Sequence, residues 1–276
     1  MNTRGIQIGV ISLCALVALA LYMLPKSAPA GLSKPLATAA GADTSFSFDA
    51  FQTEAKNGLD SASLAQLAVL ETKSDTGSLR KISDLWSVYR NAGLSGAYIE
   101  KLSIIAPTSE NWFNAGYRYM IAFRSSEKNG AKLFFTRKAI ACFKTVLDKD
   151  SNNLEAKANL GVCYVEGSQT LGTAPMKGVK LLLDVVEKDP KNITALVNLG
   201  YFSIQSGQLD KAIERFNQIL KINPDYLEAY IYLADAYQRQ GKKEVAVNTL
   251  EILKSKNKDP ELESNIDQYI QDLKSS

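Results

Sequence analysis

The sequence contains no histidine. Histidine is the general base of Ser-His-Asp triads and Cys-His dyads, and it is a common ligand of catalytic zinc. Its absence excludes all of these sites. The sequence also lacks GxxxxGK[ST] and GxGxxG, the two glycine-rich loops that bind phosphate groups. We therefore expect no catalytic residues, no bound metal and no cofactor.

The sequence also lacks a strong charge of either sign. It has 32 Lys and Arg against 29 Asp and Glu, a formal net charge of +3, and no stripe of basic residues interleaved with aromatic ones. A protein that binds nucleic acid usually presents such a stripe, so we expect no nucleic-acid partner. Charged surface residues such as Asp148 and Asp150 are interpreted as solvated helix ends.

Cysteine is scarce, with three residues in the chain: Cys14, Cys142 and Cys163. Buried free cysteine behaves as a small apolar residue, and this is one interpretation of Cys142 and Cys163. A disulfide between these two cysteines is the alternative, and the sequence alone does not give the geometry that would decide it.

Residues 6–24 form the one long uncharged apolar run of the chain, IQIGVISLCALVALALYML. About 19 residues in a helix nearly cross the hydrocarbon core of a membrane. This length predicts a transmembrane signal anchor in residues 1–25, whereas the small residues of Ala28-Pro29-Ala30 fit a cleaved signal peptide. Arg4 favours a cytoplasmic amino end. We therefore expect a single-pass protein of the cytoplasmic (inner) membrane with a periplasmic soluble part, tethered by a flexible linker in residues 26–45.

Residues 193–260 carry one pattern twice, 34 residues apart. Large apolar, small and turn residues recur at matching positions in the two copies. Gly200 is small where two helices would cross, and Gly207 can take the positive φ that ends a helix. Asp210 is a candidate cap of the next helix, and Pro224 stops that helix. Each copy therefore predicts a pair of antiparallel helices whose apolar face must be covered by a neighbouring pair.

This period and these residues resemble the tetratricopeptide repeat (TPR) family. Longer copies of the same frame occupy residues 154–192 and 109–153, with extra residues at 166–178 and around 124–138. Residues 46–108 form a degenerate helical part, in which Gly93 imitates the turn glycine, and residues 261–276 form a capping helix. The resemblance implies an all-α protein, a right-handed TPR-type solenoid of stacked antiparallel helix hairpins, preceded by one transmembrane helix.

Asparagine stands at the sixth position of the first helix in three successive copies, as Asn114, Asn159 and Asn198, and Tyr232 takes this place in the fourth. In TPR proteins this position faces the concave groove. A row of amides can bond the backbone of an extended peptide, or each amide can make a local hydrogen bond. The other residues that the resemblance assigns to the groove are mostly apolar: Phe113, Tyr117, Tyr201 and Asp235.

These observations predict a non-catalytic scaffold that binds a peptide or a partner protein in its groove at the membrane surface. The chain is similar to bacterial single-pass TPR proteins of the cell envelope. The alternative is a self-assembling structural component, or an accessory subunit of an envelope complex such as one for cytochrome c maturation or envelope assembly.

Overall fold

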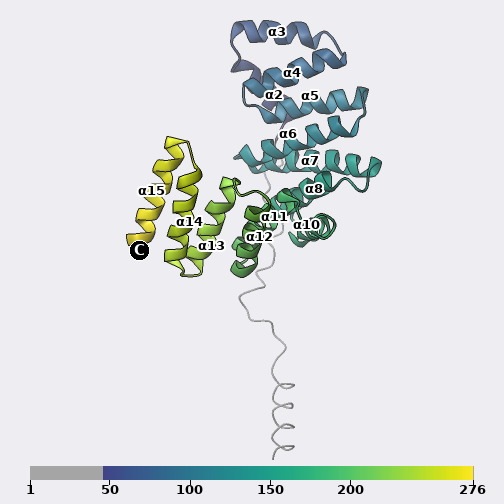
Figure 1. Cartoon of the computed structure of the whole chain (residues 1–276). Helices are drawn as coiled ribbons and strands as arrows, with labels where there is room; N and C mark the ends of the chain where they lie inside the picture. The colour runs from purple at the N-terminus through teal and green to yellow at the C-terminus, as the bar shows by residue number, and fades with distance from the viewer. Residues whose placement is uncertain (1–45, 276) are drawn as a thin grey trace, which may run out of the picture. The chain divides into compact units, whose positions relative to one another are not determined.

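The computed structural model describes residues 46–275, and every regular element in that range is a helix (Figure 1). The helices are α2 (Phe48–Asn57), α3 (Ser61–Glu71), α4 (Thr76–Val88), α5 (Ala92–Ile105), α6 (Ser109–Ser125), α7 (Asn129–Lys149), α8 (Leu154–Glu166), α9 (Ser168–Leu171), α10 (Met176–Lys188), α11 (Ile193–Gln205), α12 (Leu209–Ile222), α13 (Leu227–Arg239), α14 (Lys243–Lys256) and α15 (Pro260–Ser275).

Asparagine residues at the same place in two successive copies begin the helices α8 and α11. Asn153 accepts a hydrogen bond from the Ala156 amide at 2.9 Å, and Asn192 accepts one from the Ala195 amide at the same distance. Such a side chain satisfies one of the amides that has no partner at a helix start. The repeat therefore fixes where α8 and α11 begin.

The helices pack in antiparallel pairs along the chain, with α4 on α5, α6 on α7, α8 on α10, α11 on α12 and α13 on α14 (Figure 1). The first helices also contact one another in order, α6 with α8, α8 with α11 and α11 with α13. We call α6, α8, α11 and α13 the first-helix row. The all-α solenoid predicted from the sequence is confirmed by this arrangement, while its right-handed sense stays a prediction.

Glycines set the close crossings and the turns of the hairpins. A Cβ atom on Gly200 would lie 2.7 Å from the Phe216 ring, so α11 and α12 can cross this closely only with glycine there. Gly207 and Gly241 take positive φ angles of 74° and 76° and end the first helices of their hairpins. Both roles were predicted from the sequence for the copy at 193–226, and both are confirmed there.

Arg90 takes the turn position in the α4–α5 hairpin, with a φ of 54°. Its amide bonds to the carbonyl of Ser87 and the next amide to that of Trp86, the same two bonds that surround Gly207 and Gly241. The prediction from the sequence that Gly93 imitates the turn glycine is therefore wrong. Gly93 instead lies inside α5, where a Cβ atom would meet the Phe135 ring at 2.5 Å.

Two further local predictions need correction. Asp210 does not cap α12, because that helix already begins at Leu209 and has no side-chain cap. The extra residues around 124–138 do not form a long join, because α6 runs to Ser125 and α7 starts at Asn129. The extra residues lengthen the helices α6 and α7 instead. The insertion at 166–178 contains the short helix α9 between α8 and α10.

No helix within residues 46–275 is both long enough and apolar enough to cross a membrane. This finding contradicts the predicted single-pass location in the cytoplasmic membrane with a periplasmic soluble part. The predicted anchor at 6–24 and the linker at 26–45 lie outside the described residues.

Cys142 and Cys163 are free thiols, and both are buried in the core that joins α5 to α11. Burial raises the pKa of Cys142 to about 12 and also raises that of Cys163. Of the two interpretations offered by the sequence, the structure shows the buried free cysteines.

Candidate functional site

Tyrosine side chains lie exposed on the first-helix row. Tyr117 on α6 is 46% exposed and Tyr201 on α11 is 36% exposed. The ring of Tyr201 meets the ring of Tyr232 on α13 edge to face, with centroids 5.6 Å apart. Tyr232 in turn stacks on Phe216, a fully buried residue of the α11–α13 core. The structure thus brings the Tyr201 and Tyr232 rings into contact. The buried Phe216 ring packs against Tyr232 and holds it in place.

The asparagines of the predicted ladder make local hydrogen bonds. The Asn159 amide donates to the carbonyl of Glu155 at 2.9 Å, and the Asn198 amide donates to the carbonyl of Thr194 at 2.7 Å. Asn159 is also buried, whereas Asn114 and Asn198 are half-buried. Two of the three side-chain amides therefore donate to a backbone carbonyl of their own helix. Peptide binding by these three residues stays a prediction.

Phe113 and Asp235 have partners within the protein. The Phe113 ring packs edge to face on the Phe143 ring, with centroids 5.5 Å apart, so it extends the hydrophobic core. Asp235 accepts a hydrogen bond from Arg239 at 2.8 Å, one turn along α13. The sequence analysis did not distinguish these supporting contacts from exposed groove positions.

Arg124, which no sequence pattern singles out, lies in the last turn of α6. Its guanidinium donates two hydrogen bonds to Glu166, of 2.7 Å from Nε and 2.6 Å from Nη2, and this bonding raises the Arg124 pKa. Burial and the charge of Glu228 raise the pKa of Tyr232 to about 12, and the charge of Arg124 opposes them. Arg124 also interacts electrostatically with Tyr117.

The tyrosine and arginine side chains of the first-helix row are suited to recognising another molecule. Tyrosine supplies an apolar ring with a hydroxyl, and arginine supplies donors in a fixed plane. Within the part of the chain that the structure describes, no three histidine, cysteine or carboxylate side chains gather as metal ligands would.

Two models of known protein families match part of the chain. Residues 181–214 and residues 203–264 match two family models described as tetratricopeptide repeat. No curated protein matches the sequence.

Several solved structures resemble the chain at low similarity. A crystal structure of MamA protein is 20% identical with a TM-score of 0.47, covering 66% of this chain and 91% of that one. YrrB, titled a TPR protein with an unusual peptide-binding site, is 19% identical with a TM-score of 0.45, covering 73% and 96%. A MamA fragment from Desulfovibrio magneticus RS-1 is 18% identical with a TM-score of 0.47, covering 64% and 92%.

The family matches fall on α10 to α15, where the hairpin landmarks repeat most regularly. Together the two matches cover residues 181–264, and the resemblance to tetratricopeptide repeats is supported there.

Proposed function

We propose that the protein is a non-catalytic scaffold that binds a peptide or a partner protein along the first-helix row. The observation that carries this proposal is the exposed Tyr201 ring packed edge to face on Tyr232, on the same row as the exposed Tyr117. Solenoid repeats stack into extended surfaces that bind other chains. Tyrosine and arginine are enriched among the residues that contribute most to protein interfaces.

The chemistry of the row favours an extended peptide with apolar or aromatic side chains. The rings of Tyr201 and Tyr232 already lie edge to face, so a third ring can pack beside them in the same geometry. Arg124 is held by Glu166 and Arg239 by Asp235, so neither arginine offers an unneutralised charge to an acidic peptide. Recognition through apolar contact agrees with these pairings better than recognition of an acidic tail.

Peptide selection from a displayed random library tests the proposal, followed by affinity measurement with a recovered peptide. Tyr117→Ala combined with Tyr201→Ala should weaken binding at least about tenfold, because a large interface residue contributes roughly 2 kcal/mol or more. Ile104→Ala is the control, because Ile104 is 67% exposed and belongs to α5, which is not one of the helices of the row. Equal affinity in wild type and the double variant, or equal losses in variant and control, would contradict the proposal.

A second candidate is a self-assembling structural component, favoured by the surface of α3. This helix has no charged residue from Ser61 to Leu70, and it exposes Leu64 (44%) and Val69 (60%). The outer helices of a soluble solenoid are normally polar, as α15 is at the other end. Light scattering over a range of protein concentrations distinguishes the two candidates. A monomer at every concentration removes the second one.

A further inference from the structure

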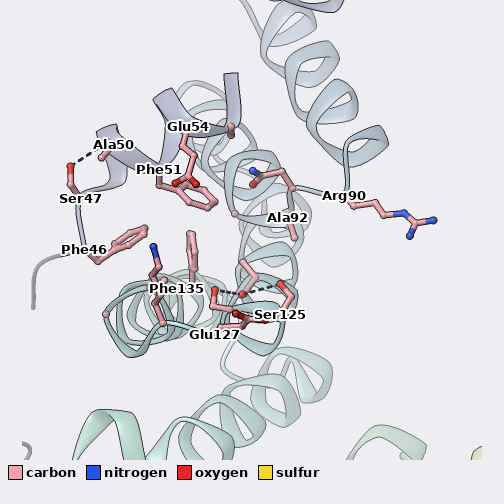
Figure 2. Close-up of a pocket in the computed structure, with 18 of the residues that line it drawn as sticks. Phe46, Ser47, Ala50, Phe51, Glu54, Arg90, Ala92, Ser125, Glu127 and Phe135 are labelled. Atoms are coloured by element: carbon pink, nitrogen blue, oxygen red, sulfur yellow. Dashed lines mark hydrogen bonds between the residues drawn. The ribbon is translucent and has the colours of Figure 1, made fainter. Parts of the chain in front are cut away.

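A cavity of about 670 Å³ lies between α2, the α4–α5 turn and the start of α7 (Figure 2). It shares no residue with the groove predicted on the first-helix row. Its volume falls within the range of about 300–1,000 Å³ that is usual for small-molecule sites. It is therefore a separate place for a ligand, and no motif in the sequence indicates it.

Three phenylalanine rings form the apolar wall of the cavity. The Phe46 and Phe51 rings have centroids 5.8 Å apart, and the Phe135 ring of α7 lies 5.7 Å from the first and 5.5 Å from the second. The space beside the rings stays open because small residues, such as Ala50 and Ala92, face it. The faces of these rings carry the negative part of their quadrupole, which attracts cations.

Two carboxylates and two cationic side chains belong to the lining. Glu54 enters from α2, whereas Glu127 and Lys128 come from the α6–α7 turn. None of the three forms an ion pair within residues 46–275. Arg90 belongs to the lining, but its side chain extends away from the cavity (Figure 2). Two carboxylates and one ammonium therefore remain beside the rings.

We propose that this cavity binds a small organic ammonium ion with an apolar body. The body packs against the phenylalanine wall, and the charged nitrogen lies over a ring face or against the Glu54 carboxylate. A cation over an aromatic face is attracted by about 0.5–2 kcal/mol, more when water is excluded, and a charge-assisted hydrogen bond to a carboxylate adds to this.

An organic anion is the competing ligand, and two features favour it. Lys128, the N-cap residue of α7, makes no side-chain cap bond, and it belongs to the lining. An anion would, however, meet both Glu54 and Glu127 and would gain nothing from the ring faces. The charge balance therefore decides for the cation.

Calorimetric titration of the full chain with three probes of one shape tests the proposal: phenethylammonium, 2-phenylethanol and 3-phenylpropanoate. The ammonium should bind at least about tenfold more tightly than the alcohol, and the carboxylate should bind most weakly. Tighter binding of the carboxylate, or no detectable binding of the ammonium at millimolar concentration, overturns the proposal.

Two variants then locate the bound probe. Glu54→Gln should weaken phenethylammonium binding several-fold, whereas Glu244→Gln, an exposed glutamate without an ion pair on α14, should leave it unchanged. Ala50→Leu places its side chain in the cavity and should abolish binding of both the ammonium and the alcohol, with folding checked by circular dichroism. Unchanged binding in Ala50→Leu shows that the probe binds elsewhere and overturns the proposal.

Discussion

Arg124 and Glu166 join two successive first helices through two hydrogen bonds, with Nε–Oε2 at 2.7 Å and Nη2–Oε1 at 2.6 Å. Arg124 comes from the last turn of α6, and Glu166 is the last residue of α8. Two parallel bonds fix the plane of the guanidinium as well as its position. The pair therefore sets the orientation of Arg124.

Glu166→Gln should lower the free energy of unfolding by about 0.5–1 kcal/mol. The amide keeps the shape of the carboxylate but loses its charge and one of its acceptors. The loss stays small because the Arg124 side chain is 44% exposed and solvent screens the pair. Urea denaturation measures the change, with Glu244→Gln as the control. An equal, negligible change in both variants would mean that the pair orients Arg124 without stabilising the fold.

Gly207→Ala and Gly178→Ala should destabilise the protein for different reasons and to different extents. A Cβ atom on Gly207 meets nothing within 4 Å, so its cost is the positive φ alone, about 1–2 kcal/mol. A Cβ atom on Gly178 would lie 2.2 Å from the carbonyl oxygen of Gly161 and would push α10 away from α8. Overpacking of this kind costs about 1–3 kcal/mol or more.

Thermal and urea denaturation of the two glycine variants compare these costs directly. We expect the larger loss for Gly178→Ala, because its nearest neighbour is backbone that cannot rotate away. A larger loss for Gly207→Ala would show that the α8–α10 contact is easily rearranged.

Tyr89→Phe should reduce the loss of stability on acidification. The Tyr89 hydroxyl donates to Asp60, and this bond is the largest cause that holds the Asp60 pKa at about 2, below its usual 3.8. A lowered folded-state pKa stabilises the protein above pH 3.8, and that stability disappears as the pH falls from about 4 to about 2. Without the hydroxyl, the Asp60 pKa rises toward 3.8 and this acid dependence shrinks.

Urea denaturation of wild type and Tyr89→Phe at several pH values between 5 and 2 measures this effect. Carboxyl chemical shifts in an NMR titration report the Asp60 pKa itself. Parallel stability curves for the two proteins would contradict the assignment.

Cys142 and Cys163 should resist thiol reagents in the folded protein. Their burial leaves no access for a reagent and raises the pKa of both thiols, so little thiolate forms at pH 8. A Cys14→Ser variant removes the remaining cysteine from the measurement. Reaction with a chromogenic disulfide should begin only in denaturant and should then count two thiols. Rapid reaction under native conditions would contradict the burial.

The hairpins from α8 to α14 could be predicted because their determinants are local. Gly200 and Gly207 mark a crossing and a turn within a few residues of the helices that they shape. The helix α2 was not predicted as a separate element, because its phenylalanines find their partners far along the chain. Phe48 stacks on Phe134 of α7, with centroids 5.3 Å apart, and no sequence period connects these two residues.

The candidate site was predicted only in part, for reasons of geometry. Position in the repeat selected Tyr117 and Tyr201 as groove residues; both are exposed, and their role in binding stays a prediction. It could not reveal that the Asn159 amide donates to its own helix, because that depends on a side-chain rotamer. It also missed Arg124, whose partner Glu166 comes close only through the stacking of successive hairpins.

The core of α3 to α5 and the core of α13 to α15 share no residue. In such a chain each hairpin is stabilised mainly by contacts with its immediate neighbours. Unfolding therefore proceeds stepwise from one end and is not a single cooperative transition. The terminal helix α15 touches mainly α14 and is fastened there by the Lys254 bonds to Asp267. Unfolding of α15 would leave the Phe-lined cavity intact. The cavity and the first-helix row can therefore lose their ability to bind independently of each other.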